Sequence, residues 1–312
     1  MGVTRKEACG TLGNVNYIPL DGKPLRLTLG LRALDPGQWI EIDTHRASEM
    51  RQKADLLRNS HADVVATQPD GLLGSRELWN RLSAFVVERF PEFYTDIEYQ
   101  DGHIVAMNDV HMPDRIDVRE MHPIDACGRI VQEDVVLMRK RGDEWILVAA
   151  SLCFPSRWRL ADKIGKGLTA IHGPVPGYES QIAQPVEFMF DKIAVDRPMW
   201  RLNWTLMDDA TLYQPDVSSR WRDRSDVVAS GVDLGQALHF RVERQTLTKL
   251  PLSGDMVFTI RTYVRPLADL GGPEAYANLA TALETAEPGL VGYKGWTALL
   301  EPTLDWLRAA SR

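Results

Sequence analysis

Cysteine is scarce in this sequence, and no cysteine pair has a spacing typical of metal binding. The 312 residues contain only Cys9, Cys127 and Cys153. The number is odd and no C-x-x-C motif occurs, which argues against a disulfide scaffold, a structural zinc site and an iron–sulfur cluster. We therefore expect reduced thiols, as in a cytoplasmic protein.

Long apolar runs and nucleotide-binding motifs are also missing. No stretch approaches the ~20 consecutive apolar residues of a membrane span, and the first residues contain no apolar segment long enough for a signal peptide. No G-x-G-x-x-G motif follows a predicted strand, and no P-loop occurs. We therefore expect a cytoplasmic protein that holds no dinucleotide or nucleoside triphosphate of its own.

Positive charge is in deficit. Lys and Arg total 36 against 43 Asp and Glu, for a formal net charge of −7. Nucleic acid would require a strongly basic surface, and an anionic membrane would attract basic segments, so we expect neither partner. The 44% of apolar and 25% of charged residues are ordinary for a globular chain and exclude disorder, collagen and coiled coil.

The first half of the chain mixes strand and helix patterns. Leucines at every second position from Leu25 to Leu31 predict a strand. Helices are predicted over residues 45–60 and 75–90, where apolar residues recur at helical spacing. A loop or short hairpin is expected around Asp101-Gly102, and a clearer hairpin has its turn at residues 141–143.

The second half contains three long strand patterns between helices. We predict helices over residues 160–172 and 180–194, with Pro185 as a kink in the second. Strands follow over residues 199–207, 237–250 and 255–267, and residues from about 274 to 309 are helical in pattern. Because strands and helices do not alternate as βαβ units, the sequence predicts an α+β fold with an antiparallel sheet.

His172 is the first candidate functional residue. It ends a predicted helix and precedes the Pro-Val-Pro turn at residues 174–176, which would fix its backbone position. A neutral imidazole held in this way suits an axial ligand of haem iron. A histidine at a helix end can also bond the last carbonyls of that helix, and spacing alone favours this structural role.

Arg244 interrupts an apolar face in the strand at residues 237–250. A buried guanidinium needs an anion, because an unpaired buried charge is strongly destabilising. A haem propionate, bound bidentately, would be one such anion. An internal carboxylate such as Glu133, Asp134 or Glu243 is the alternative.

Other candidates are weaker. His103, His111 and His122 lie in a loop-rich region, but their spacing is unlike that of most metal sites. Cys153 ends an apolar strand, where it could ligate iron as a thiolate. A small core residue is the more common role for a cysteine in that position.

Six runs of residues resemble the haem-dependent oxidative N-demethylase family, the catalytic α subunit of a dimethylamine-oxidising monooxygenase. They are GLRALDPGQWIEID (30–43), CFPSRW (153–158), KIG-x-x-L-x-x-IH-x-PVP-x-Y (163–178), R-x-NW (201–204), R-x-ERQTL-x-x-LP (241–251) and FTIRTY (258–263). Their number and order make the resemblance specific.

The resemblance implies a PAS-like antiparallel sheet whose flanking helices enclose haem b. Residues 121–268 would form this haem-binding core, residues 1–120 an N-terminal mixed elaboration and residues 269–312 C-terminal helices. The implied reaction uses O₂ to oxidise an N-methyl group of a small secondary amine, with release of formaldehyde. Electrons would come from NADPH through partner reductase subunits that carry FMN and a 2Fe–2S cluster.

The resemblance also implies roles for particular residues. His172 would be the iron ligand, and Arg244, Arg241 and Arg261 would bind propionates. The remaining candidates would face the cofactor or the substrate: Asn203, Thr259 and Tyr263 on the side where O₂ binds, and Glu243, Glu133 and Trp204 beside the cationic amine.

Two other functions stay open at this point. A haem-binding PAS-type sensor of gas or redox state would use the same fold without turnover, since fold does not fix function. The absence of a following signalling module argues against it. In a domain without any cofactor, His172 and Arg244 would be purely structural.

Overall fold

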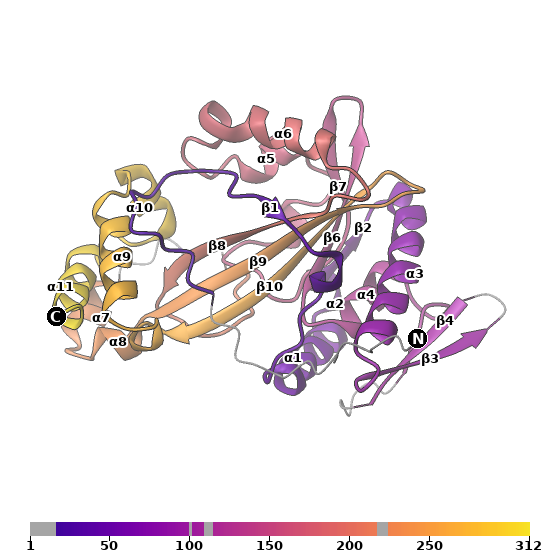
Figure 1. The fold of residues 1–312 in the computed structure, drawn as a ribbon, viewed down its shortest axis with the longest axis horizontal. Coiled ribbons are helices and arrows are strands. Elements are labelled where there is room, and N and C mark those ends of the chain that lie inside the picture. The colour runs from indigo at the N-terminus through magenta and orange to yellow at the C-terminus, as the bar shows by residue number, and fades with distance from the viewer. Residues whose placement is uncertain (1–16, 100–101, 109–114, 217–223) are drawn as a thin grey trace, which may run out of the picture.

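The computed structural model describes residues 17–99, 102–108, 115–216 and 224–312. Within these ranges the chain forms one large sheet, one small sheet and helices on both faces of the large sheet (Figure 1). This confirms the predicted α+β class. None of the helices in the described ranges has the length and apolar character required to cross a membrane.

The large sheet has seven strands in the order β1-β8-β9-β10-β6-β7-β2, and every neighbouring pair is antiparallel. The strands are β1 (Arg32–Ala33), β2 (Val65–Thr67), β6 (Asp134–Arg141), β7 (Glu144–Ser151), β8 (Met199–Met207), β9 (His239–Lys249) and β10 (Met256–Pro266). The three long strand predictions and the hairpin at residues 141–143 are therefore confirmed. Gly142 turns that hairpin at φ +60°.

A small sheet lies beside the large one, with strands β3 (Tyr94–Tyr99), β4 (Gly102–Met107) and β5 (Arg115–Asp117). Strands β3 and β4 form the predicted hairpin, with Ile97 opposite Ile104. Asp101 of the expected turn lies outside the described residues.

Helices cover one face of the large sheet, here called the back face, at both of its ends (Figure 1). One group consists of α1 (Arg46–Asn59), α3 (Leu72–Arg89) and α4 (Pro123–Ile130). The other consists of α9 (Pro273–Glu284), α10 (Pro288–Lys294) and α11 (Leu300–Ala310). The short helices are α2 (His61–Val64), α7 (Ser225–Ala229) and α8 (Leu234–Ala237), with 3₁₀ turns at Pro36–Gln38, Pro69–Gly71, Leu160–Asp162 and Leu267–Asp269.

The opposite face, here called the front face, is covered by α5 (Leu168–His172), a π-helical turn (Tyr178–Ile182) and α6 (Ala183–Lys192). The helix predicted over residues 160–172 is broken, because Gly165 has φ +78° and interrupts it. The helix predicted over residues 180–194 is divided at Ile182, where the π-helical turn gives way to α6, and Pro185 lies in the first turn of α6, where its missing N–H costs little.

The leucine-rich segment is extended, but it pairs with the sheet only at Arg32–Ala33. We call residues 18–31 the N-terminal strap. It runs from the C-terminal helices to β1 (Figure 1). Leu27, Leu29 and Leu31 pack against the front-face core, so the alternation marks a half-buried extended segment and the predicted strand is wrong.

Candidate functional site

A cavity of about 1240 Å³ lies on the front face, between the sheet, α5, α6 and the N-terminal strap. This exceeds the roughly 300–1,000 Å³ of ordinary small-molecule sites. Its walls include the apolar side chains of Leu27, Leu247, Phe258 and Ile260. The cavity is therefore large enough for a prosthetic group together with a small substrate.

His172 lines this cavity from the end of α5. Its Nδ1 donates to the Leu168 carbonyl at 2.8 Å, and its ring stacks on Tyr178 with the centroids 4.5 Å apart. A carbonyl only accepts, so the proton is on Nδ1 and Nε2 keeps its lone pair. No hydrogen bond to Nε2 occurs among the described residues.

Burial lowers the pKa of His172 to about 4, so the ring is neutral at pH 7. The bond to the helix carbonyl is the structural role considered from the sequence. It also fixes the tautomer and the ring orientation that a metal-ligating histidine requires. His172 is thus prepared for a metal at Nε2.

Polar side chains of β8 and β9 form the floor of the cavity. Asn203 lies opposite Glu243 in the ladder. The Glu243 Oε2 accepts from Asn203 Nδ2 at 3.3 Å and from Gln245 Nε2 at 3.0 Å. Two neutral donors thus hold a carboxylate in the cavity, where it can receive a cation.

Arg201 lies beside this carboxylate on the same face, opposite Gln245. Its Nε is buried without a hydrogen-bond partner, and burial lowers the pKa of its guanidinium. The Tyr178 hydroxyl, which also lines the cavity, is buried without a partner as well.

A basic rim lines the outer part of the cavity. It comprises Arg26 of the N-terminal strap, Arg159, Lys163 and Lys166, with Asp162 as a negative neighbour. Except for the half-buried Lys163, these cations are exposed. An anionic group bound at the rim would keep contact with water.

Four residues predicted to face the cofactor instead lie on the back face: Arg244, Arg261, Thr259 and Tyr263. Opposite residues of an antiparallel pair share a face, and Arg261 lies opposite Arg244. None of the four lines the cavity. The expectation that they surround the cofactor is corrected, because the cavity face of β10 carries Phe258 and Ile260.

Arg244 has protein partners in place of a propionate. Its Nε forms an ion pair with Glu41 Oε1 at 3.2 Å, and its other nitrogens donate to the Gln38 and Trp39 carbonyls. An internal carboxylate therefore neutralises it, though not one of the three considered from the sequence. The hydroxyl of Tyr263 donates to the same Glu41.

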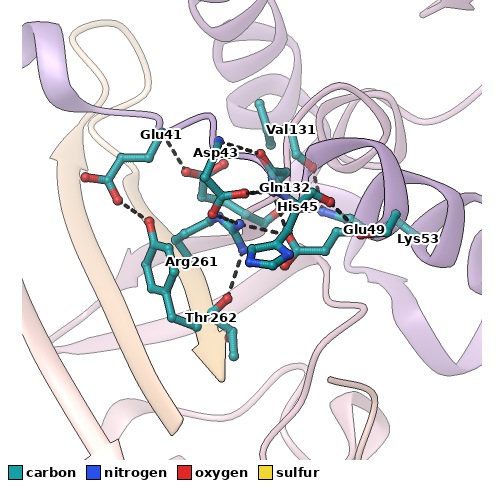
Figure 2. Close-up of polar contacts among 12 residues, drawn as sticks. Glu41, Asp43, His45, Glu49, Lys53, Val131, Gln132, Arg261 and Thr262 are labelled. Carbon is teal, nitrogen blue, oxygen red and sulfur yellow. Dashed lines mark hydrogen bonds and ion pairs between the residues drawn. The ribbon is translucent and has the colours of Figure 1, made fainter. Parts of the chain in front are cut away.

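Arg261 belongs to a second buried network on the back face (Figure 2). Its Nη2 pairs with Asp43 Oδ2 at 2.5 Å and with Glu49 Oε2 at 2.8 Å. These carboxylates and neighbouring ones raise the pKa of Arg261 against the opposing effect of burial. The arginine joins β10 to the segment before α1 and to α1 itself. Glu133, a predicted amine partner, is fully buried beside this network, and burial raises its pKa to about 7.

The other predicted residues also have structural partners. Arg241 donates to the Phe154 carbonyl at 2.7 Å and does not line the cavity. The Thr259 hydroxyl bonds the Thr246 hydroxyl at 2.6 Å. Trp204 lines the cavity, but its ring stacks on Trp296 in the C-terminal core.

Neither the three-histidine site nor the cysteine ligand gains support. His122 caps α4 by accepting from the Ile124 N–H, and His111 lies outside the described residues. In the described part of the chain, no three His, Cys, Asp or Glu side chains gather as a metal site would require. Burial raises the pKa of Cys153 to about 12, which disfavours a thiolate.

A family model described as haem-dependent oxidative N-demethylase, alpha subunit-like, matches residues 30–304. The chain belongs to this family. The match includes the cavity residues of α5, β8 and β9, but only the last two residues of the N-terminal strap, Gly30 and Leu31. It confirms the resemblance found in the six sequence runs.

Sequence reasoning missed Arg201 and the basic rim as functional candidates. Arg201 belongs to the R-x-NW run and alternates with the apolar residues of β8, which was the available signal. The rim residues come from the strap and from the loops before α5. No local pattern relates segments that are so distant in the sequence.

Proposed function

We propose that this protein is the haem-binding catalytic subunit of an oxidative N-demethylase that acts on a small methylated amine. The carrying observation is His172, which lines a large cavity with its Nδ1 tied to a carbonyl and its Nε2 available. We also propose that the sheet with α5 and α6 is a PAS-like haem core.

The described residues fit haem b. The Nε2 of His172 would bind the iron, and the apolar side chains of Leu247, Phe258 and Ile260 would contact the macrocycle. The propionates would lie at the basic rim, with Arg159 and Lys166 as partners, because there they keep contact with water. These roles replace those first expected for Arg244, Arg241 and Arg261.

Bound haem would supply O₂ activation, so that one oxygen atom enters an N-methyl C–H bond and the resulting N–CH₂OH group breaks into amine and formaldehyde. The chain itself positions the amine. A small secondary amine is a cation near pH 7, and the Glu243 carboxylate offsets its desolvation. Asn203 and Gln245 hold that carboxylate in place, and the apolar walls exclude water.

The reaction also needs electrons from outside this chain. We propose that they come from NADPH through partner reductase subunits carrying FMN and a 2Fe–2S cluster. The sequence contains neither a dinucleotide fingerprint nor a cysteine set for a cluster, so these cofactors would have to belong to other chains.

The first experiment is a visible spectrum of the full chain purified after growth with a haem precursor. We expect a Soret band that shifts with dithionite and with CO. A surrogate reductase, NADPH and methylated amines should then yield formaldehyde. A protein without a Soret band would refute the proposal. If haem reduction is confirmed and no amine yields formaldehyde, the result counts for the haem-binding sensor and against the demethylase.

A double variant tests the rim. Arg159→Gln together with Lys166→Gln should speed transfer of haem to apomyoglobin several-fold, since the propionates lose their counter-ions. Arg58→Gln on α1, an exposed arginine away from the cavity, is the matched control. An unchanged transfer rate in the double variant would remove the rim from the propionate role.

A further inference from the structure

The cavity floor holds two opposite charges side by side that no ion pair joins. We propose that Arg201 and Glu243 together bind a zwitterionic substrate, an N-methylated amino acid, whose carboxylate meets Arg201 and whose ammonium group meets Glu243. This inference rests on the proposed function and specifies its substrate class.

Arg201 has no carboxylate at ion-pair distance among the described residues, and Glu243 acts on it only from farther away. Its Nε is buried and unpartnered, and no hydrogen bond joins its guanidinium to any described residue. The buried, unpartnered hydroxyl of Tyr178 offers a second donor in the same cavity. A buried donor without a partner lowers the stability of the fold. We therefore expect a bound ligand to supply the acceptor for both groups.

Glu243 has spare acceptor capacity. Both of its hydrogen bonds from Asn203 and Gln245 go to Oε2, and no described residue donates to Oε1. An ammonium N–H can therefore bind Oε1 without displacing a protein partner.

The strand register places the two charged residues close together on one face. Arg201 lies opposite Gln245, and Asn203 lies opposite Glu243, so Arg201 and Glu243 are diagonal neighbours on one face. The backbone positions of diagonal neighbours are roughly 7–8 Å apart, within reach of one small molecule between two long side chains. In an α-amino acid a single carbon separates the nitrogen from the carboxylate, so the two groups of one molecule can each form a hydrogen bond with one of these side chains.

Dimethylammonium or a haem propionate alone would fit these two charged side chains less well. Dimethylammonium would pair with Glu243 but leave Arg201 without an anion. A haem propionate at Arg201 would lie in the cavity floor, away from the water and the cations at the basic rim. An N-methylated amino acid satisfies both groups.

The overall reaction for the simplest member balances. N-methylglycine, O₂, two electrons and two protons give glycine, formaldehyde and water. One oxygen atom ends in formaldehyde and the other in water, while the two electrons come from the reductase of the proposed function.

The test compares ligands on the haem-loaded full chain. N-methylglycine, dimethylamine and acetate are titrated by calorimetry and by the change they cause in the Soret band. We expect N-methylglycine to bind at least tenfold more tightly than either of the other two. Arg201→Gln should abolish this preference without loss of the Soret band. Glu243→Gln should weaken the binding of both N-methylglycine and dimethylamine.

Equal affinities for N-methylglycine and dimethylamine in the unaltered protein would overturn the inference. Loss of haem from Arg201→Gln would also overturn it, because the arginine would then bind a propionate. If Arg201→Gln does not fold, Arg201→Lys is used in its place. It keeps the positive charge but lacks the planar guanidinium, and it must weaken the binding of N-methylglycine more than that of dimethylamine. If no preparation contains haem, the proposed function fails, while calorimetry on the haem-free chain still decides whether the charge pair binds N-methylglycine.

Discussion

His172 shows how one side chain can serve the helix and the site together. Its Nδ1 bonds the carbonyl of Leu168, one turn earlier, which satisfies a helix end. The same bond fixes the orientation of the ring and leaves Nε2 without a hydrogen bond to any described residue. The structural role favoured from spacing alone is therefore real, and it is compatible with metal binding.

His172→Ala should abolish stable haem binding, because no other histidine among the described residues lines the cavity. The measurement is the Soret absorbance per chain after purification. His61→Ala, on a half-exposed histidine that pairs with Asp125, is the control and should retain haem. An unaltered Soret band in His172→Ala would mean that the ligand lies elsewhere.

Glu133 makes the stability of the fold depend on pH. Burial raises its pKa from 4.5 to about 7, and its Oε2 has no hydrogen-bond partner. The folded state thus holds a proton that the unfolded state releases above pH 4.5. Its stabilising contribution is present below pH 4.5 and is lost as the pH rises through 7, a change of at most about 3 kcal/mol.

Glu133→Gln removes this titration. The free energy of unfolding, measured by urea denaturation between pH 5 and 8, should fall less steeply with rising pH than in the unaltered protein. Glu88→Gln, on the exposed side of α3, should keep the original slope. Identical slopes in the two variants would show that Glu133 is not the group responsible.

At the scale of elements, close packing of α4 on the sheet depends on a glycine. A Cβ at Gly128 would lie 2.0 Å from the Oγ of Ser151 on β7. Gly128→Ala should therefore destabilise the protein by about 1–3 kcal/mol through overpacking. Thermal unfolding measures this change.

The matched control is Gly292→Ala in α10, where a Cβ would meet nothing within 4 Å. That change should be neutral or stabilising by up to about 1 kcal/mol, because alanine favours a helix more than glycine does. Equal effects of the two substitutions would show that the contact with Ser151 does not limit the packing of α4.

The side-chain alternation of β9 and β10 could be predicted from the sequence, but the position of the cavity could not. The alternation correctly separated Arg244 from Glu243 and Arg261 from Ile260, since side-chain direction has period two. It did not tell which face carries the cavity. That depends on where α5 and α6 fold back, and both faces of the sheet contain buried charged residues. Arg244 and Arg261 are therefore expected at a cofactor, although protein acceptors on the back face hold them.

The N-terminal strap shows a related limit. Its leucines alternate as in a strand, and the half-burial that this pattern implies is present. The alternation does not predict which residues pair with another strand. In this segment only Arg32 and Ala33 pair with β8. A high β-propensity shows that a segment fits a pleated, half-buried surface. It does not show that the segment forms backbone hydrogen bonds with a neighbouring strand.

At the scale of the whole molecule, the strap closes one side of the cavity. Replacing Leu27 and Leu29 with Ser removes apolar contacts to the front-face core. We expect haem transfer to apomyoglobin to become several-fold faster, while the fold persists by circular dichroism. Leu252→Ser is the control, because this leucine is 88% exposed on the turn between β9 and β10. An unchanged rate would show that the strap does not retain the cofactor.

The attachment of the strap has a consequence for biosynthesis. The Leu25 N–H donates to Thr285 Oγ1, and the Leu20 carbonyl accepts from Asn278, so the strap's anchor points follow it by some 260 residues. The ribosome makes the strap early and its anchors near the end. Because β8 and β9 form the cavity floor, the cavity exists only once these strands have been made, and its strap side stays unattached until residues 278–285 follow. A prosthetic group can enter in that interval, before the C-terminal helices fix the strap in place.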